Sequence, residues 1–205
     1  MSATRKSAAE RRREIVEATL RLLAEVGEGR LSTQAIADQV GITQAGLFRH
    51  FPTKNDLWIA VLTEIERRAR RSWIRASREC DPAVLRLRKI LLSQLRLIEN
   101  YPAIPILLFS QGRLAAEDAV HPIHMRIMTA LRLRILEELT MAVEASEQRA
   151  QIDTLDLESL LMGTLQDCVL RWSLMGRKYD LIAEGDRLIR LQLRLFGLEA
   201  GAGSS

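Results

Sequence analysis

The sequence predicts an all-α protein of about nine helices, with a small N-terminal head of three helices joined by a long helix to a larger helical body. Of the 205 residues, 47% are hydrophobic but only 4% are aromatic, and Leu, Ala, Arg and Glu are abundant. This composition favours helices over strands. Apolar residues recur at helical spacing, and capping residues divide the chain into helix-sized segments.

The first helix is predicted between Ser7 and Gly27. Ser7 and Glu10 have the spacing of a capping box, in which side chain and backbone of the two residues bond reciprocally. Gly27 supplies a C-terminal stop. The inward stripe consists of Ile15, Thr19, Leu22 and Val26.

Three further helix starts follow at Ser32, Thr43 and Thr53. Gly41 ends the helix capped by Ser32, and the next helix ends at Phe51 because a proline follows. The helix that opens at Thr53 is long enough to run to about residue 80. Beyond it we expect helices over residues 82–100, 103–116, 122–147, 154–176 and 181–196. We expect a head over 1–57, a body over 58–198 and a flexible tail over 199–205.

Residues 32–51 have the pattern of a helix-turn-helix. Ala37 is small where the two short helices cross, and Gly41 can adopt a positive φ in the turn. Ile42 directs the turn into the core. Thr43 caps the second helix and leaves its start pointing outward, as in a recognition helix that enters the DNA major groove.

The outward face of that second helix carries groups that can read base edges. Gln44 can bond adenine through two atoms, and Arg49 can bond guanine or a phosphate. Ala45 is short enough to contact a thymine methyl group, and Gly46 allows close backbone approach. Around them, contacts to DNA phosphates or to groove edges are expected from Ser32, Thr33, Gln34 and Thr43, and a phosphate contact is expected from Lys54.

The distribution of charged residues is a further, weaker indication of DNA binding. The net charge is +4, and residues 1–13 hold five basic side chains against one acidic side chain. The rest of the chain is therefore close to neutral. A basic arm beside a helix-turn-helix is typical of proteins that bind nucleic acid.

Residues 8 to about 60 resemble the tetracycline-repressor (TetR) family of bacterial regulators. The resemblance rests on Ile36-Ala37, Gly41-Ile42-Thr43, Leu47-Phe48-Arg49-His50-Phe51 and Lys54. It implies operator contacts from Thr33, Gln34, Gln44, Ala45, Gly46, Phe48, His50 and Lys54. The family usually has Tyr where this chain has Phe48, which has no hydroxyl to donate to a phosphate.

The resemblance implies a cytoplasmic, homodimeric repressor of a pseudo-palindromic DNA operator, released by a small and largely apolar effector. A second hypothesis is a DNA-bound adaptor that acts through a protein partner without a small ligand. We expect no enzymatic activity and no cofactor, because none of the common catalytic or nucleotide-binding motifs occurs. A membrane-spanning helix is not expected, because no apolar run approaches about 20 residues.

The body is expected to hold the dimer interface and an effector pocket. Apolar stripes suited to a four-helix interface contain Leu157, Leu161, Leu165, Leu188, Leu191 and Leu195. Candidate pocket residues are Phe109, Met125, Met128, Met162, Trp172 and Met175. For both sets the alternative is an ordinary core within one subunit.

Metal and disulfide chemistry have little support in the sequence. Cys80 and Cys168 are far apart and fit neither a zinc spacing nor a disulfide framework. His121, His124 and Asp118 raise the idea of a metal sensor, but they lack a fourth ligand. We therefore expect no metal.

Overall fold

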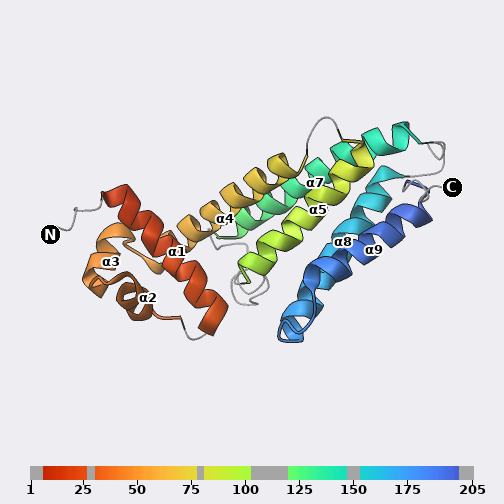
Figure 1. The fold of residues 1–205 in the computed structure, drawn as a ribbon. Coiled ribbons are helices and arrows are strands. Elements are labelled where there is room, and N and C mark those ends of the chain that lie inside the picture. Colours follow the sequence, from red (N-terminus) through yellow and green to blue (C-terminus); the bar gives the residue numbers. More distant parts are fainter. Residues whose placement is uncertain (1–6, 27–30, 78–80, 103–119, 147–152, 199–205) are drawn as a thin grey trace. The chain divides into compact units, whose positions relative to one another are not determined.

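The computed structural model describes residues 7–26, 31–77, 81–102, 120–146 and 153–198 (Figure 1). Every regular element in these ranges is an α-helix, so the all-α prediction is confirmed. The chain divides into two compact units, residues 1–67 with 101–125 and residues 68–100 with 126–205. The helix predicted over 103–116 lies outside the described residues.

The first unit begins with α1 (Ala8–Val26), α2 (Thr33–Val40) and α3 (Gln44–His50), followed by the first part of α4 (Lys54–Ala76). The capping box predicted at the start of α1 is confirmed. The Ser7 N–H donates to Glu10 Oε2 at 2.7 Å, and the Glu10 N–H donates to Ser7 Oγ at 3.2 Å. Such a cap stabilises a helix by about 1 kcal/mol.

The helices α1, α2 and α3 pack against one another around an apolar core. Thr19 is buried in that core, and its hydroxyl donates to the Ile15 carbonyl at 2.8 Å, so its polar group is satisfied. Leu22, predicted to face inward, is only half-buried. The buried apolar residues of the first unit include Ile15, Leu20, Leu23, Ile36, Ala37, Leu47, Phe51, Leu57 and Trp58.

The second unit contains the rest of α4, α5 (Ala83–Asn100), most of α7 (Val120–Glu144), α8 (Thr154–Leu174) and α9 (Leu181–Leu195). Helix α9 packs against both α5 and α8. Gly185 of α9 allows the close approach to α5, because a Cβ atom there would overlap the Leu95 side chain.

Ion pairs join the helices of the second unit. Arg88 of α5 bonds both carboxylate oxygens of Asp186 of α9, at 2.5 and 2.7 Å. Glu138 of α7 is almost fully buried and pairs with Arg86 at 2.8 Å and Arg134 at 3.0 Å. A buried carboxylate with two guanidinium partners avoids the large cost of an unpaired buried charge.

None of the helices in the described parts of the chain is long and apolar enough to cross a membrane.

Candidate nucleic-acid interface

The turn between α2 and α3 has the geometry that the sequence predicts. Gly41 has a φ of 72°, in the left-handed region that glycine tolerates best. The N–H groups of Gly41 and Ile42 donate to the Asp38 and Ala37 carbonyls at 3.1 and 3.0 Å. These bonds satisfy carbonyl groups at the end of α2 and direct the chain toward α3.

The start of α3 is capped by Thr43, whose Oγ1 accepts from the Gly46 N–H at 3.0 Å. Gly46 is buried, and a Cβ there would lie 3.2 Å from this same oxygen. The missing side chain therefore makes room for the Thr43 cap. This packing role differs from the close approach to DNA that the sequence suggests for Gly46.

The polar residues at the start of α2 are all hydrogen-bonded. Ser32 Oγ caps the helix by accepting from a backbone N–H in its first turn at 3.0 Å. Thr33 Oγ1 accepts from Gln44 Nε2 at 2.6 Å, which links α2 to α3. Gln34 Nε2 donates to Asp38 Oδ1 at 2.6 Å. The structure thus joins two predicted DNA contacts, Thr33 and Gln44.

The outward face of α3 is accessible. Gln44, Ala45 and Arg49 are exposed, whereas Leu47 on the opposite face is buried. Phe48 keeps 38% of its surface exposed, which is notable for an aromatic residue. A helix with one buried side and one exposed polar side can lie in a groove without disturbing its own packing.

Lys54 is exposed at the start of α4, as predicted. The Thr53 and Asp56 side chains cap the start of the helix, because Asp56 Oδ2 accepts from the Thr53 N–H at 2.9 Å and the Asp56 N–H donates to Thr53 Oγ1 at 3.1 Å. The Lys54 ammonium group thus lies at a helix start, where the helix dipole also favours an anion.

Arg12 of α1 contacts the C-terminal end of α3. Its Nη1 donates to the His50 carbonyl oxygen, and its guanidinium lies 4.2 Å from the centroid of the Phe51 ring. Phe51 is fully buried and is the C-cap residue of α3. Sequence reasoning missed this role, because the hydrogen bond joins residues 38 positions apart and only the basic character of the arm pointed to Arg12.

Comparison with known proteins identifies this arrangement. Residues 15–61 match the model for bacterial regulatory proteins of the tetR family. The nucleoid occlusion factor SlmA of Vibrio atlanticus (strain LGP32) is 30% identical over 187 residues, which cover 88% of this chain and 91% of that relative. The chain belongs to the tetR family. This tetR-family protein is a DNA-binding transcriptional regulator, and its helix-turn-helix is α2 and α3.

Solved structures share the fold over most of the tetR-family chain. A TetR transcription regulator from Haloarcula marismortui ATCC 43049 superposes with a TM-score of 0.77 at 18% identity, covering 91% of this chain and 98% of that one. The regulator FadR from Bacillus subtilis, in complex with stearoyl-CoA, superposes with a TM-score of 0.70 at 18% identity, covering 88% and 96%.

The predicted pocket residues occupy different environments. Met162 and Trp172 of α8 are buried, and the Trp172 Nε1–H donates to the Tyr179 carbonyl at 3.2 Å. Met128 is half-buried. Met125 and Met175 are exposed, at 48% and 56%. Phe109 lies outside the described residues, so a pocket formed by this whole set stays a prediction.

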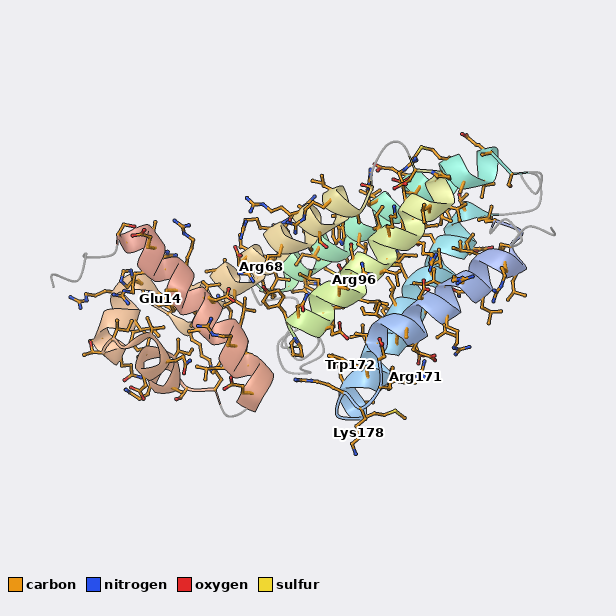
Figure 2. All side chains as sticks on the ribbon, in the orientation of Figure 1. Glu14, Arg68, Arg96, Arg171, Trp172 and Lys178 are labelled. Atoms are coloured by element: carbon orange, nitrogen blue, oxygen red, sulfur yellow. The ribbon has the colours of Figure 1, made fainter. Side chains whose placement is uncertain are left out.

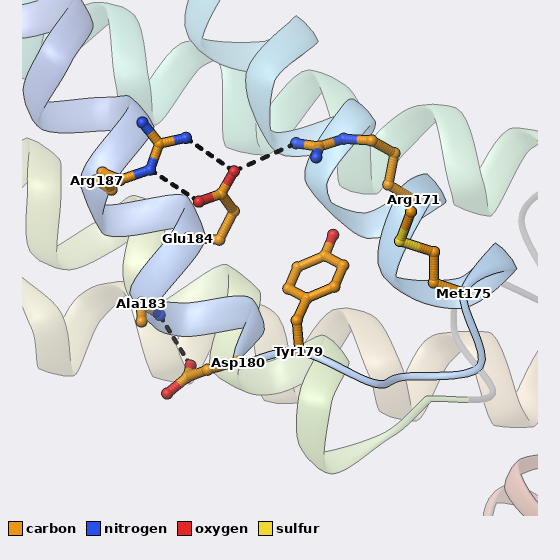
Figure 3. Close-up of a pocket in the computed structure, with 7 residues that line it drawn as sticks. All are labelled: Arg171, Met175, Tyr179, Asp180, Ala183, Glu184 and Arg187. Carbon is orange, nitrogen blue, oxygen red and sulfur yellow. Dashed lines mark hydrogen bonds and ion pairs between the residues drawn. The ribbon is translucent and has the colours of Figure 1, made fainter.

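A surface pocket of about 450 Å³ lies at the turn from α8 to α9 (Figure 3). Glu184 accepts from Arg187 at 2.8 and 2.9 Å and pairs with Arg171 at 3.7 Å, and the hydrogen bond from Arg187 holds the Glu184 pKa below its ordinary value. Figure 2 shows Arg171 beside Trp172 on α8. Of the predicted pocket residues that the structure describes, only Met175 lines this pocket. Its lining is Arg171, Met175, Tyr179, Asp180, Ala183, Glu184 and Arg187.

The predicted dimer residues separate into two groups. Leu157, Leu161 and Leu165 of α8 are buried inside the subunit, at 0%, 0% and 5% exposure, because they lie on the face that packs against other helices. Leu188 is half-buried, and Leu191 and Leu195 of α9 are exposed. Leu160, which lies on the predicted apolar stripe of α8, is exposed, as are Leu155, Leu170 and Leu174 of the same helix.

The histidines of the metal-sensor hypothesis lie at the start of α7. Both His121 and His124 are half-buried, and burial, together with the nearby His121, lowers the pKa of His124. Asp118, the third member of the hypothesis, lies outside the described residues. Within the part of the chain that the structure describes, no three His, Cys, Asp or Glu side chains are grouped to hold a metal ion.

Proposed function

We propose that the protein is a homodimeric repressor that binds a pseudo-palindromic operator through α3 and is released by a small, largely apolar effector. The observation that carries the DNA-binding part is the exposed face of α3, with Gln44, Ala45 and Arg49 on a helix whose other face is buried. This face lies within the residues that match the tetR-family model.

In the proposed complex, Gln44 reads adenine, Ala45 contacts a thymine methyl group, and Arg49 bonds guanine or a phosphate. Lys54 neutralises a phosphate as a point charge. Phe48 contributes an apolar contact to the sugar-phosphate edge in place of a hydroxyl contact. Contacts to the DNA backbone that fix the position of the protein on the duplex come from Ser32, Thr33, Gln34, Thr43 and His50. Gly46 is buried and makes room for the Thr43 cap, and its lack of a side chain lets the α3 backbone approach the duplex closely in the proposed complex.

Two copies would pair through the exposed leucines of α8 and α9. Leu174 and Leu195 are 78% and 75% exposed, and Leu160 and Leu191 add to the same two helices. Apolar side chains on two packed helices are well suited to a four-helix interface. Pairing would place two α3 helices in successive major grooves, about 34–36 Å apart.

Effector binding is proposed for the body, residues 58–198, with residues 1–57 as the DNA-binding domain and 199–205 as a flexible tail. The support for a ligand with a long apolar part is that FadR of Bacillus subtilis, similar in fold, was solved with stearoyl-CoA. An effector that prefers a conformation with a different spacing of the two heads weakens DNA binding by the same factor as DNA weakens effector binding. Such a repressor would act in the cytoplasm.

A second candidate is a DNA-bound protein that acts through a protein partner. The observation that favours it is the 30% identity, over most of both chains, to a nucleoid occlusion factor. A screen of small molecules by thermal shift, combined with capture of partners by DNA-bound protein, separates the two. A ligand that raises the melting temperature and releases DNA supports the repressor, and a stable ternary complex without any ligand effect supports the adaptor.

The first experiment is a gel-shift titration of the full chain with the DNA upstream of its own gene, with unrelated duplex as competitor. We expect a specific complex that survives competition and contains two copies of the protein. A failure to shift this or any palindromic duplex specifically would contradict the proposed function.

A further inference from the structure

Thr33 and Gln44, the first residues of α2 and α3, are joined by a side-chain hydrogen bond. Gln44 Nε2 donates to Thr33 Oγ1 at 2.6 Å, across the two helices of the helix-turn-helix. Gln44 is exposed and Thr33 is half-buried. A long, exposed amide is thus tied to a shorter side chain on the neighbouring helix, in the protein without DNA.

The hydroxyl groups of Ser32 and Thr43, near Thr33 and Gln44 in the sequence, form a different kind of hydrogen bond. Ser32 Oγ and Thr43 Oγ1 each accept from a backbone N–H of their own helix, at 3.0 Å. Of these three hydroxyls, the one on Thr33 accepts from a side chain on the other helix. Its oxygen is therefore placed to orient Gln44 rather than to start α2.

The hydrogen bond leaves a defined set of groups on Gln44. A glutamine amide has two N–H donors and one carbonyl acceptor. A bond to Thr33 through the N–H trans to the carbonyl leaves the other N–H and the carbonyl oxygen side by side. Adenine presents the matching pair in the major groove, N7 as acceptor and the N6 amino group as donor. Guanine presents two acceptors there, so the amide carbonyl would face the O6 oxygen.

We propose that Thr33 is a positioning residue that holds the Gln44 amide in the orientation that reads adenine. This inference rests on the proposed entry of α3 into the major groove and specifies which base it selects. A side chain that is ordered before binding loses less conformational freedom in the complex. The Thr33 hydroxyl proton stays available to donate to a DNA phosphate oxygen. Thr33 can therefore orient the base-reading Gln44 and contact the DNA backbone at the same time.

The test begins with wild-type full-length protein and a pool of random-sequence DNA duplexes, from which bound duplexes are selected and sequenced. Binding is then measured on the selected duplex and on copies in which single adenines are replaced by 7-deazaadenine, which lacks the N7 acceptor. Thr33→Val removes the acceptor with little change of shape, and Thr33→Ser retains a hydroxyl. Ser7→Ala is the control, because it removes the helix cap of α1 and leaves the Thr33 hydroxyl and the proposed DNA contacts intact.

We expect that replacing one particular adenine of each half-site by 7-deazaadenine lowers the affinity of both wild type and Thr33→Ser for the duplex. For Thr33→Val the discrimination at that adenine should shrink by about 2- to 10-fold, the range expected when one side chain must be ordered on binding. For Ser7→Ala we expect a lower melting temperature and unchanged base preference. Equal discrimination by Thr33→Val and wild type would overturn the inference, as would a selected site in which no adenine N7 matters. If wild type selects no sequence at all, the proposed function fails and the inference fails with it.

Discussion

The guanidinium of Arg12 lies 4.2 Å from the centroid of the Phe51 ring, and the same side chain donates to the carbonyl of His50. Both contacts are at the C-terminal end of α3, where a positive charge also complements the helix dipole. Arg12 therefore anchors the recognition helix to α1. The orientation of the exposed α3 face depends in part on a residue that is not on that face.

Arg12→Ala should lower the stability of the protein. Loss of the ring contact and of the charge at the helix end should cost about 1–2 kcal/mol in the free energy of unfolding. Urea unfolding measures this, with Arg13→Ala, an exposed neighbour on α1, as the control. DNA binding should weaken without a change in its salt dependence. A lower salt slope with unchanged stability would show instead that Arg12 contacts a phosphate.

Arg49→Ala and Lys54→Ala should weaken DNA binding in different ways. If Arg49 reads a base, its loss should cost about 1–3 kcal/mol on the operator and relax the sequence preference at one position. Loss of Lys54 should weaken binding to every duplex and lower the slope of affinity against salt by about one, because one phosphate contact is lost. Fluorescence anisotropy on specific and random duplexes at several salt concentrations measures both effects. A changed base preference in Lys54→Ala would contradict this assignment.

Gly185→Ala should destabilise the body, because the new methyl group would overlap the Leu95 side chain. Overpacking of this kind costs about 1–3 kcal/mol. Gly163→Ala on α8 is the matched control, since a Cβ there meets nothing within 4 Å and alanine favours the helix by about 0.5–1 kcal/mol. Thermal unfolding of the two variants should therefore move in opposite directions. Equal melting temperatures would mean that α5 and α9 do not approach closely at Gly185.

Leu195→Asp should convert the proposed dimer to a monomer. Leu195 is 75% exposed in the single chain, so the substitution leaves the subunit core intact but places a charge in the proposed interface. Sedimentation velocity measures the outcome. Leu133→Asp on α7, a leucine with 56% exposure, serves as control and should leave the dimer unchanged. If Leu195→Asp remains a dimer, this part of α9 does not belong to the dimer interface.

His124 should make the protein less stable as the pH falls. Its pKa in the folded protein is below the ordinary value of 6.5, so the unfolded chain binds the proton first. The stabilisation associated with neutral His124 is thus fully present above about pH 6.5 and is lost as the pH falls through the folded pKa. Unfolding of wild type and His124→Gln between pH 8 and 5 isolates this contribution. Parallel curves for the two proteins would contradict it.

Local features of the fold could be predicted from the sequence, because they depend on neighbouring residues. The Ser7 capping box, the Ser32 and Thr43 caps and the positive φ of Gly41 are all confirmed. Asp81 is an instructive exception. Asp81 followed by Pro82 has the sequence pattern of an N-cap before a proline in the first turn. Its carboxylate instead pairs with Lys89 at 2.7 Å, and the helix begins at Ala83. A competing cation two turns along the helix explains the difference.

Features that depend on contacts between distant segments could not be predicted in this way. Periodicity placed Leu157, Leu161 and Leu165 on an apolar stripe, but it could not indicate that the subunit itself covers them. The Arg12–His50 and Thr33–Gln44 hydrogen bonds span 38 and 11 residues. Each joins two different helices of the head, so its partners can be identified only once the packing of those helices is known.

The most direct test of the central claim, that the exposed face of α3 reads DNA, is the affinity of a Gln44→Ala/Arg49→Ala double variant for a duplex selected by wild type. Both side chains are exposed, and loss of the Gln44 bond to Thr33 should cost about 1 kcal/mol, so the variant should stay folded, which urea unfolding checks. We predict a loss of about 30-fold or more on the selected duplex and a much smaller change on random duplex. Equal affinity of the two proteins for the selected duplex would contradict the account.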